Sequence, residues 1–212
     1  MTPSKLDTMS VLTPGKPPFV LLASIGNPED GYGSTRHNVG HQFLNELVQH
    51  HWTDFEPFKV HRNLPHGEVS LSNEMHPNLV LFKSTNSLMN LQGGPISQTW
   101  EKIRRLKESS TSPALVVVHD ELQLPLGKFQ IRRQGTSARG HNGLRSISNS
   151  MGSGYTKIGI GIGKPAHRNV ALYVLGSFKQ EEKMELSYNV FPKIIEALAQ
   201  MEKGEHIYEV YK

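Results

Sequence analysis

The sequence predicts an α/β fold: a single-domain, three-layer α/β/α sandwich around a mixed, mostly parallel sheet. Short apolar runs of strand length alternate along the chain with segments whose apolar residues recur at helical spacing. One run, Ala114–Val118, is apolar throughout, which is typical of a central strand that helices cover on both faces. The 212 residues suffice for one domain with a sizeable core, and they contain no internal repeat and no interdomain linker.

The first predicted strand, residues 19–24, is an apolar run between Pro18 and Gly26. Further strands are expected where apolar or alternating residues stand between turn residues, at 67–71, 78–83, 114–118, 128–133, 157–162 and 170–174. Helices are expected at 38–51, 94–107, 141–149 and 180–203. Pro192 should break or restart the last of them. Residues 52–77 have little periodicity and give no clear prediction.

Composition excludes several classes of protein. Residues 1–18 contain four Pro and no apolar core, so we expect a flexible N-terminal arm before a catalytic domain at 19–212. The arm lacks the apolar stretch of a secretory signal and the Arg residues of a mitochondrial presequence. No apolar run approaches the roughly 20 residues of a membrane span, and the absence of Cys excludes disulfides and a thiol nucleophile. We expect a cytoplasmic monomer without membrane contact, and a mitochondrial location stays open.

The charges are distributed unevenly. The interval between Glu121 and Glu181 contains no Asp or Glu but nine of the 23 basic residues, so that 14 basic and 19 acidic residues remain elsewhere. A solvated basic surface would account for this pattern, but a one-sided basic field also suits a polyanion such as nucleic acid. A membrane surface is a poorer partner, because no basic amphipathic helix is evident.

Four polar clusters follow predicted strands or open predicted helices. They are Asn27 with His37, Asn90, Asp120, and His141 with Asn142. Because strand carboxyl ends converge at one edge of an α/β sheet, these side chains should lie together. A His held by Asp through one ring nitrogen can act as a general base through the other, and Asn amides can bind a developing oxyanion. Each residue taken alone also has a structural interpretation, as a surface His, a turn residue or a helix cap.

Other catalytic motifs are absent or incomplete. The run Gly159–Lys164 lacks the glycine spacing of a P-loop, and Pro165 stands where that motif needs Ser or Thr. There is no Gly-x-Ser-x-Gly for a serine hydrolase and no His-Glu-x-x-His for a zinc enzyme.

Six ordered blocks resemble the bacterial-type peptidyl-tRNA hydrolase family. The resemblance extends from about residue 19 to about residue 200, and the order of six blocks makes it highly specific. The blocks are Gly26-Asn27-Pro28 with Thr35-Arg36-His37-Asn38-x-Gly40, Leu88-Met89-Asn90-Leu91-x-Gly93, Val118-His119-Asp120-Glu121-Leu122-x-Leu124-Pro125, Gly140-His141-Asn142-Gly143-Leu144, Ile160-Gly161-Ile162-Gly163-x-Pro165 and Tyr173-Val174-Leu175-Gly176-x-Phe178.

The resemblance implies hydrolysis of the ester between a peptide and the 3′ end of tRNA, without a metal or cofactor. It implies that His37 is the base that activates water and that Asp120 orients it. It also implies substrate contacts at Asn27, Tyr32, Met89, Asn90, His141 and Asn142. The partner would be peptidyl-tRNA, bound through its acceptor stem and 3′ CCA end. A non-catalytic RNA-binding relative, such as an intron-splicing factor, is the alternative, although it would need neither His37 nor Asp120.

The basic interval would then hold the tRNA phosphates. The predicted contacts are Lys128, Arg132, Arg133, Arg139, Arg145 and Lys157. Two positions depart from the family pattern: Arg139 stands where the family usually has Gly, and Gly159 stands where it has a basic residue. Lys157, two residues earlier on the same strand face, is the expected substitute for the latter.

Overall fold

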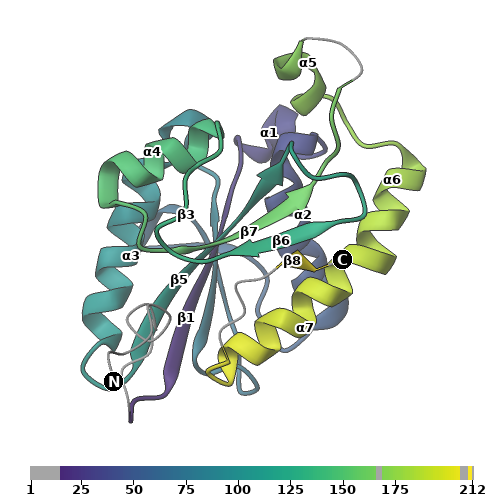
Figure 1. Cartoon of the computed structure of the whole chain (residues 1–212). Coiled ribbons are helices and arrows are strands. Elements are labelled where there is room, and N and C mark those ends of the chain that lie inside the picture. Colours follow the sequence, from purple (N-terminus) through teal and green to yellow (C-terminus); the bar gives the residue numbers. More distant parts are fainter. Residues whose placement is uncertain (1–14, 166–168, 206–209, 212) are drawn as a thin grey trace, which may run out of the picture.

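The computed structural model describes residues 15–165, 169–205 and 210–211. Within these residues, eight strands form one sheet in the order β2-β3-β4-β1-β5-β7-β6-β8 (Figure 1). The strands are β1 (Pro18–Ile25), β2 (Lys59–His61), β3 (Leu64–Leu71), β4 (Leu79–Ser84), β5 (Ser112–Glu121), β6 (Phe129–Arg132), β7 (Thr156–Gly161) and β8 (Val210–Tyr211). The helices are α1 (Glu29–Tyr32), α2 (Val39–Glu46), α3 (Gly93–Lys107), α4 (Asn142–Met151), α5 (Val170–Val174), α6 (Gln180–Glu185) and α7 (Phe191–Glu202).

The sheet is mixed, as predicted. Its central strands β4, β1, β5 and β7 pair in parallel, whereas the outer pairings β2/β3, β3/β4, β6/β7 and β6/β8 are antiparallel. Only β3 and β6 among the described strands therefore run against the others. The carboxyl ends of the four central strands meet at one edge, where ligands bind in sheets of this kind.

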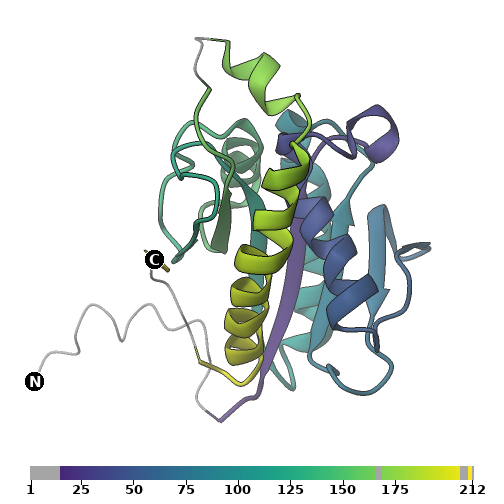
Figure 2. The same cartoon turned by 90° about the vertical axis from the view of Figure 1, so that its right-hand side faces the viewer.

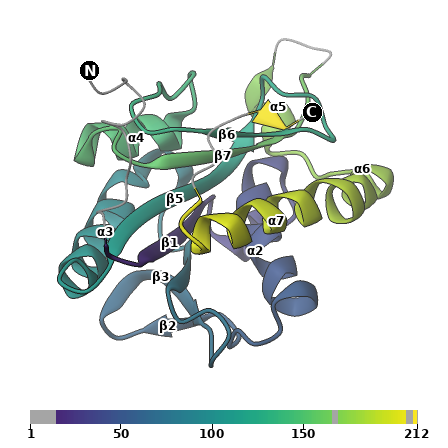
Figure 3. The same cartoon turned by 60° about the horizontal axis from the view of Figure 1, so that its bottom comes forward.

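Helices cover both faces of the sheet, which confirms the three-layer prediction (Figure 3). Alternate residues of β1 point to opposite faces. Leu21 and Ile25 pack into a core with residues of α3 and α4, whereas Leu22 packs with residues of α2 and α7. Figure 2 shows α6 and α7 as one continuous column along the second face.

Most predicted elements are confirmed, with shifted ends. β5 is the longest strand and continues through Asp120, which the prediction placed after the strand. The helix widens into a π-helical turn at Leu186–Val190, just before Pro192. It then continues as α7 instead of ending. In the unclear region 52–77, β2 and β3 form a hairpin beside β4.

One prediction is wrong: residues 170–174 form helix α5, not a strand. Asn169 caps this helix, because its side-chain oxygen accepts a hydrogen bond from the Leu172 N–H at 3.0 Å. The predicted arm at 1–18 falls mainly on residues 1–14, outside the described residues, and Pro18 belongs to β1.

Two glycines bring elements unusually close at the ligand-binding edge. A Cβ atom at Gly40 of α2 would stand 2.8 Å from the Val118 carbonyl oxygen of β5. A Cβ atom at Gly143 of α4 would stand 2.7 Å from Sδ of Met89. Both helices can therefore approach the sheet edge only because these positions lack a side chain.

None of the described helices is both long and apolar enough to cross a membrane.

Candidate active site

Asp120 forms the floor of the site. It lies near the carboxyl end of β5, opposite Ile160 of β7, and is only 3% exposed. Burial by itself raises the pKa of this carboxyl, but the imidazoles of His37 and His141 outweigh burial and hold that pKa far below its usual range. Asp120 is therefore a carboxylate, which can only accept hydrogen bonds.

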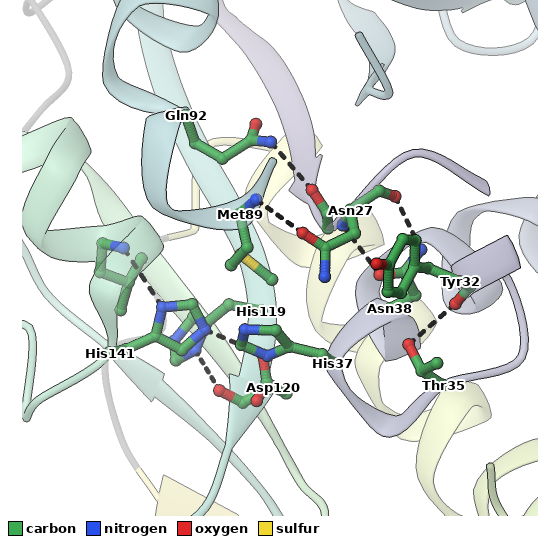
Figure 4. Close-up of polar contacts among 12 residues, drawn as sticks. Asn27, Tyr32, Thr35, His37, Asn38, Met89, Gln92, His119, Asp120 and His141 are labelled. Atoms are coloured by element: carbon green, nitrogen blue, oxygen red, sulfur yellow. Dashed lines mark hydrogen bonds and ion pairs between the residues drawn. The ribbon is translucent and has the colours of Figure 1, made fainter. Parts of the chain in front are cut away.

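His37 lies on the turn Arg36–Asn38 that leads into α2. Its Nδ1 is 2.8 Å from Oδ1 of Asp120, as Figure 4 shows. Since the carboxylate is an acceptor, the proton of the neutral ring sits on Nδ1, and Nε2 keeps a free lone pair. Burial lowers the pKa of His37, but the charge and the hydrogen bond of Asp120 raise it more, so the pKa lies above the ordinary value of 6.5.

His141 also donates to Asp120. Its Nε2 is 2.8 Å from the same Oδ1 atom, and its Nδ1 accepts a hydrogen bond from the Leu144 N–H at 3.2 Å. His141 is thus the N-terminal cap of α4, a role that leaves Nδ1 without a hydrogen and places the proton on Nε2. The His37 and His141 ring centroids are 5.4 Å apart.

These three side chains also form a group of the kind that can hold a metal ion. One nitrogen or oxygen atom from each of His37, Asp120 and His141 lies within 4.8 Å of the others. Both nitrogens that face Asp120 carry hydrogens, however, and the Leu144 N–H fixes the tautomer of His141. The three side chains therefore form a hydrogen-bonded relay, His37–Asp120–His141. A cation could bind there only by displacing the hydrogens of both bonds.

Asn27 is held from two sides beside this relay. Oδ1 of Asn38 accepts from the Asn27 N–H at 2.9 Å, and Nδ2 of Asn38 donates to the Asn27 carbonyl at 2.8 Å. The side-chain Oδ1 of Asn27 accepts from the Met89 N–H at 2.8 Å. The orientation of the amide follows, and Nδ2 of Asn27 is left as a donor with no hydrogen-bond partner among the described residues (Figure 4).

Gln92 joins the two loops that carry Asn27 and Met89. It is fully buried, and its Nε2 donates to the Gly26 carbonyl at 2.9 Å and to the Ser87 carbonyl at 3.0 Å. Neither Gln92 nor Asn38 was singled out from the sequence. Both lie within motif blocks. Their partners are backbone groups of other loops, which a pattern of residue types does not reveal.

A cleft of about 460 Å³ opens beside the relay. His37, Asp120 and His141 line it together with Asn142, and the α5 segment supplies an apolar wall. The wall residues are Val170, Ala171, Val174 and Leu175.

Arg36, next to His37, connects this wall to the turn Arg36–Asn38. Its guanidinium donates to the Ser177 carbonyl at 2.5 Å and to Glu182 at 2.7 Å, and it lies over the Tyr173 ring at 4.6 Å. Arg36 belongs to the first motif block, but the sequence alone predicts no role for it.

The remaining predicted substrate contacts lie around this centre. Asn142 is exposed at the start of α4, where it lines the cleft. Asn90 is exposed on the turn Met89–Leu91, next to the buried Met89. Tyr32 is 36% exposed at the end of α1 and does not line the cleft. His41 and His119, which the prediction passed over, are fully buried histidines.

The predicted phosphate contacts divide into two groups. Lys128, Arg133, Arg139 and Arg145 are exposed. Arg132 and Lys157, in contrast, are buried. Arg132 is 4% exposed and donates to the Ser137 carbonyl at 2.7 Å, while the ammonium of Lys157 packs over the Tyr155 ring at 4.1 Å. Burial, together with the charge of Arg132, lowers the pKa of Lys157 to about 8.

Arg139 keeps a backbone conformation that favours glycine. Its φ is +48°, and it is the only non-glycine residue with positive φ in the described part of the chain. Its guanidinium donates to Oε1 of Gln130 at 2.9 Å and lines the cleft. The loop therefore retains the shape that a Gly would adopt, and it adds a cation at the rim of the site.

Comparisons with known proteins identify the family of this chain. The family model described as Peptidyl-tRNA hydrolase matches residues 21–210. The peptidyl-tRNA hydrolase of Wolinella succinogenes is 33% identical over 88% of this chain and 89% of its own, and that of Corynebacterium efficiens is 38% identical over 77% and 85%. A crystal structure of peptidyl-tRNA hydrolase from Acinetobacter baumannii superimposes with a TM-score of 0.70 at 24% identity, covering 92% of this chain and 91% of that one, which supports the fold. The chain belongs to the peptidyl-tRNA hydrolase family.

Proposed function

We propose that this protein is a peptidyl-tRNA hydrolase, which cleaves the ester bond between a peptide and the 3′ end of tRNA. The observation that carries the proposal is the His37–Asp120 pair beside an open cleft, in a chain that belongs to this family. Hydrolysis of an ester needs a positioned base and an oxyanion donor, and His37 and Asn27 are the side chains that we propose for these two roles.

In the proposed reaction, Nε2 of His37 takes a proton from a water molecule as the water oxygen attacks the ester carbonyl carbon. Asp120 holds the ring by Nδ1–H and stabilises the imidazolium that forms. The tetrahedral intermediate then collapses, the bond from carbon to the ribose oxygen breaks, and the imidazolium returns its proton to that oxygen. The products are a peptide acid and a tRNA with a free terminal hydroxyl.

Asn27 is the proposed oxyanion donor, because its Oδ1 is occupied by the Met89 N–H and its Nδ2 is available. Asn90, Asn142 and Tyr32 offer exposed polar groups for the peptide. Met89 and the ring face of His141 add apolar surface there, since both polar edges of His141 are in use. Contacts to the first peptide amide would disfavour aminoacyl-tRNA, which has a free amine instead.

The exposed basic residues are the proposed contacts for the acceptor stem and the 3′ CCA end. Lys128, Arg133 and Arg145 would bind phosphates without regard to base identity, and Arg139 at the cleft rim would meet the terminal nucleotides. These side chains account for the whole reaction, so we expect a single chain to be active without a cofactor.

The decisive experiment measures release of N-acetyl amino acid from N-acetyl-aminoacyl-tRNA in EDTA, with wild type beside His37→Ala. We expect turnover by wild type, its loss in the variant, and much slower cleavage of aminoacyl-tRNA. A folded wild-type protein that binds tRNA but releases no product would contradict the proposal and favour a non-catalytic RNA-binding role.

A further inference from the structure

Two imidazoles share a single carboxylate oxygen in this site. Oδ1 of Asp120 is 2.8 Å from Nδ1 of His37 and equally 2.8 Å from Nε2 of His141. A base that acted with its carboxylate alone would need only the first of these bonds. The second donor therefore calls for a role of its own.

Helix α4 holds His141 in the donating tautomer. The Leu144 N–H occupies Nδ1, so the ring can only present Nε2–H to Asp120. The start of α4 is itself fixed, because Leu144 and Ile147 are fully buried and the Tyr155 hydroxyl donates to the Leu144 carbonyl at 3.1 Å. His141 thus cannot withdraw its hydrogen from Asp120 without losing the cap of the helix.

A second N–H donor to Oδ1 of Asp120 weakens the hydrogen bond and the charge stabilisation that this oxygen gives to His37. When His37 takes a proton, its imidazolium is stabilised by the negative charge and the lone pairs of Asp120. The bond from His141 already neutralises part of that charge, which limits the stabilisation. His37 then returns to its neutral, reactive form at a lower pH than an unshared pair would allow, closer to the pH at which a general base works best.

We propose that His141 is a positioning residue, which sets the basicity of His37 by sharing Oδ1 of Asp120. The inference rests on the proposed hydrolase function only for its kinetic consequence. The effect on the His37 ring itself is a property of the folded protein and can be measured without substrate.

The other charged groups near His37 are few. Among the described residues that line the cleft they are Asp120, Glu121 and Arg139, and α5 contributes only apolar side chains. His119 packs edge-on against His141, with ring centroids 5.1 Å apart, and burial holds the pKa of His119 well below its usual value. Arg36 is paired with Glu182 on the other side of the turn. Arg139 is exposed, so its influence on His37 should fade with salt, whereas that of a buried hydrogen bond should not.

Two variants separate the bonds that His141 makes. In His141→Asn, the side-chain oxygen stands near the position of Nδ1 and can still cap α4, but the amide is too short to reach Asp120. In His141→Gln, the amide nitrogen stands near the position of Nε2 and can still donate to Asp120, but the cap is lost.

The measurement is an NMR titration of the His37 ring in the full chain, at low and high salt. We expect His141→Asn to raise the pKa of His37 by about one unit, as a hydrogen bond to a charged group should, and His141→Gln to stay near wild type. The shift should persist in high salt. His141→Ser, which also caps, replaces the Asn variant if that variant does not fold.

The proposal is overturned if the Asn and Gln variants shift His37 equally, or if neither shifts it. A merely structural His141 would give that result, with the Gln variant losing the most thermal stability. In the hydrolase assay the acid limb of kcat/KM should move with the titration. If wild type proves inactive, the titration still decides the role of His141, and only the proposed function fails.

Discussion

At the scale of single residues, hydrogen bonds fix the orientation or the tautomer of each side chain proposed to act in the reaction. The Met89 N–H takes Oδ1 of Asn27, and the Leu144 N–H takes Nδ1 of His141. The carboxylate of Asp120 takes the hydrogen of His37. Nδ2 of Asn27 and Nε2 of His37 are therefore left available, whereas Nε2 of His141 is directed to Asp120.

Replacing Asp120 by Asn tests the orientation of His37. The amide cannot stabilise an imidazolium, so kcat/KM should fall by about 10²–10⁴-fold. In wild type the base is neutral only above its raised pKa, so kcat/KM should rise with pH through a midpoint above 6.5. In Asp120→Asn burial alone remains, and the midpoint should fall below 6.5. A pH–rate profile with an unmoved midpoint would contradict the assignment.

Replacing Asn27 by Asp tests the oxyanion donor. The new side chain keeps the oxygen that accepts from Met89 but removes the Nδ2 hydrogens and adds a negative charge. We expect kcat to fall by about 10²–10³-fold, as on loss of one oxyanion donor, with a smaller change in KM. Asn63→Asp, an exposed residue in the turn between β2 and β3, is the matched control. A variant that loses affinity and keeps its rate would point to substrate binding instead.

At the scale of elements, the site depends on contacts between distant parts of the chain. Arg36 of the turn Arg36–Asn38 binds Ser177 and Glu182, and Gln92 links the 84–92 loop to Gly26. The α5 wall of the cleft is thus held by Arg36, the residue next to the proposed base His37.

Replacing Glu182 by Ala should loosen that wall. The variant leaves the Arg36 guanidinium without its carboxylate and removes the bond from the Lys179 N–H, so the free energy of unfolding should fall by about 1–3 kcal/mol. KM should rise more than kcat falls, because the wall is apart from the reacting atoms. Urea denaturation and steady-state kinetics measure both effects, with the exposed neighbour Glu181→Ala as control. Equal behaviour of the two variants would show that the tether is unimportant.

The sequence predicts the elements in which apolar residues recur with a clear helical or strand period. It misses α5, a short helix that is set by its cap. The apolar run of Val170–Val174 is too short to distinguish a strand from a helix, and Asn169 at its start was the available signal. The proximity of His37 and Asp120 could be predicted, because the segments that follow parallel strands meet at one edge of the sheet. The burial of Arg132 and Lys157 could not be predicted, because alternation does not tell which face of β6 and β7 is covered.

At the scale of the whole molecule, charge is separated along the sheet. The acid-free interval contains β6, β7 and α4, whereas the acidic residues lie on the remaining elements. Such a field would attract a polyanion to the side of the molecule that carries the cleft.

Salt dependence of tRNA binding tests this separation. Arg133→Ala should weaken binding and reduce the slope of log K against log salt by about one, because each phosphate contact releases counterions. Lys157→Met should leave the slope unchanged, since that ammonium is buried. Lys203→Ala, exposed at the end of α7 away from the site, is the control (Figure 1). An effect of Lys157→Met on the slope equal to that of Arg133→Ala would contradict the exclusion of this buried ammonium from the phosphate contacts.

The glycine at position 40 determines how closely α2 packs against β5, and so how far His37 lies from Asp120. It lets α2, which follows His37, rest directly on the Val118 carbonyl, two residues before Asp120. Any side chain there would push the two members of the pair apart. A saturation mutagenesis survey should therefore find position 40 as intolerant as the catalytic positions, although its residue never meets the substrate.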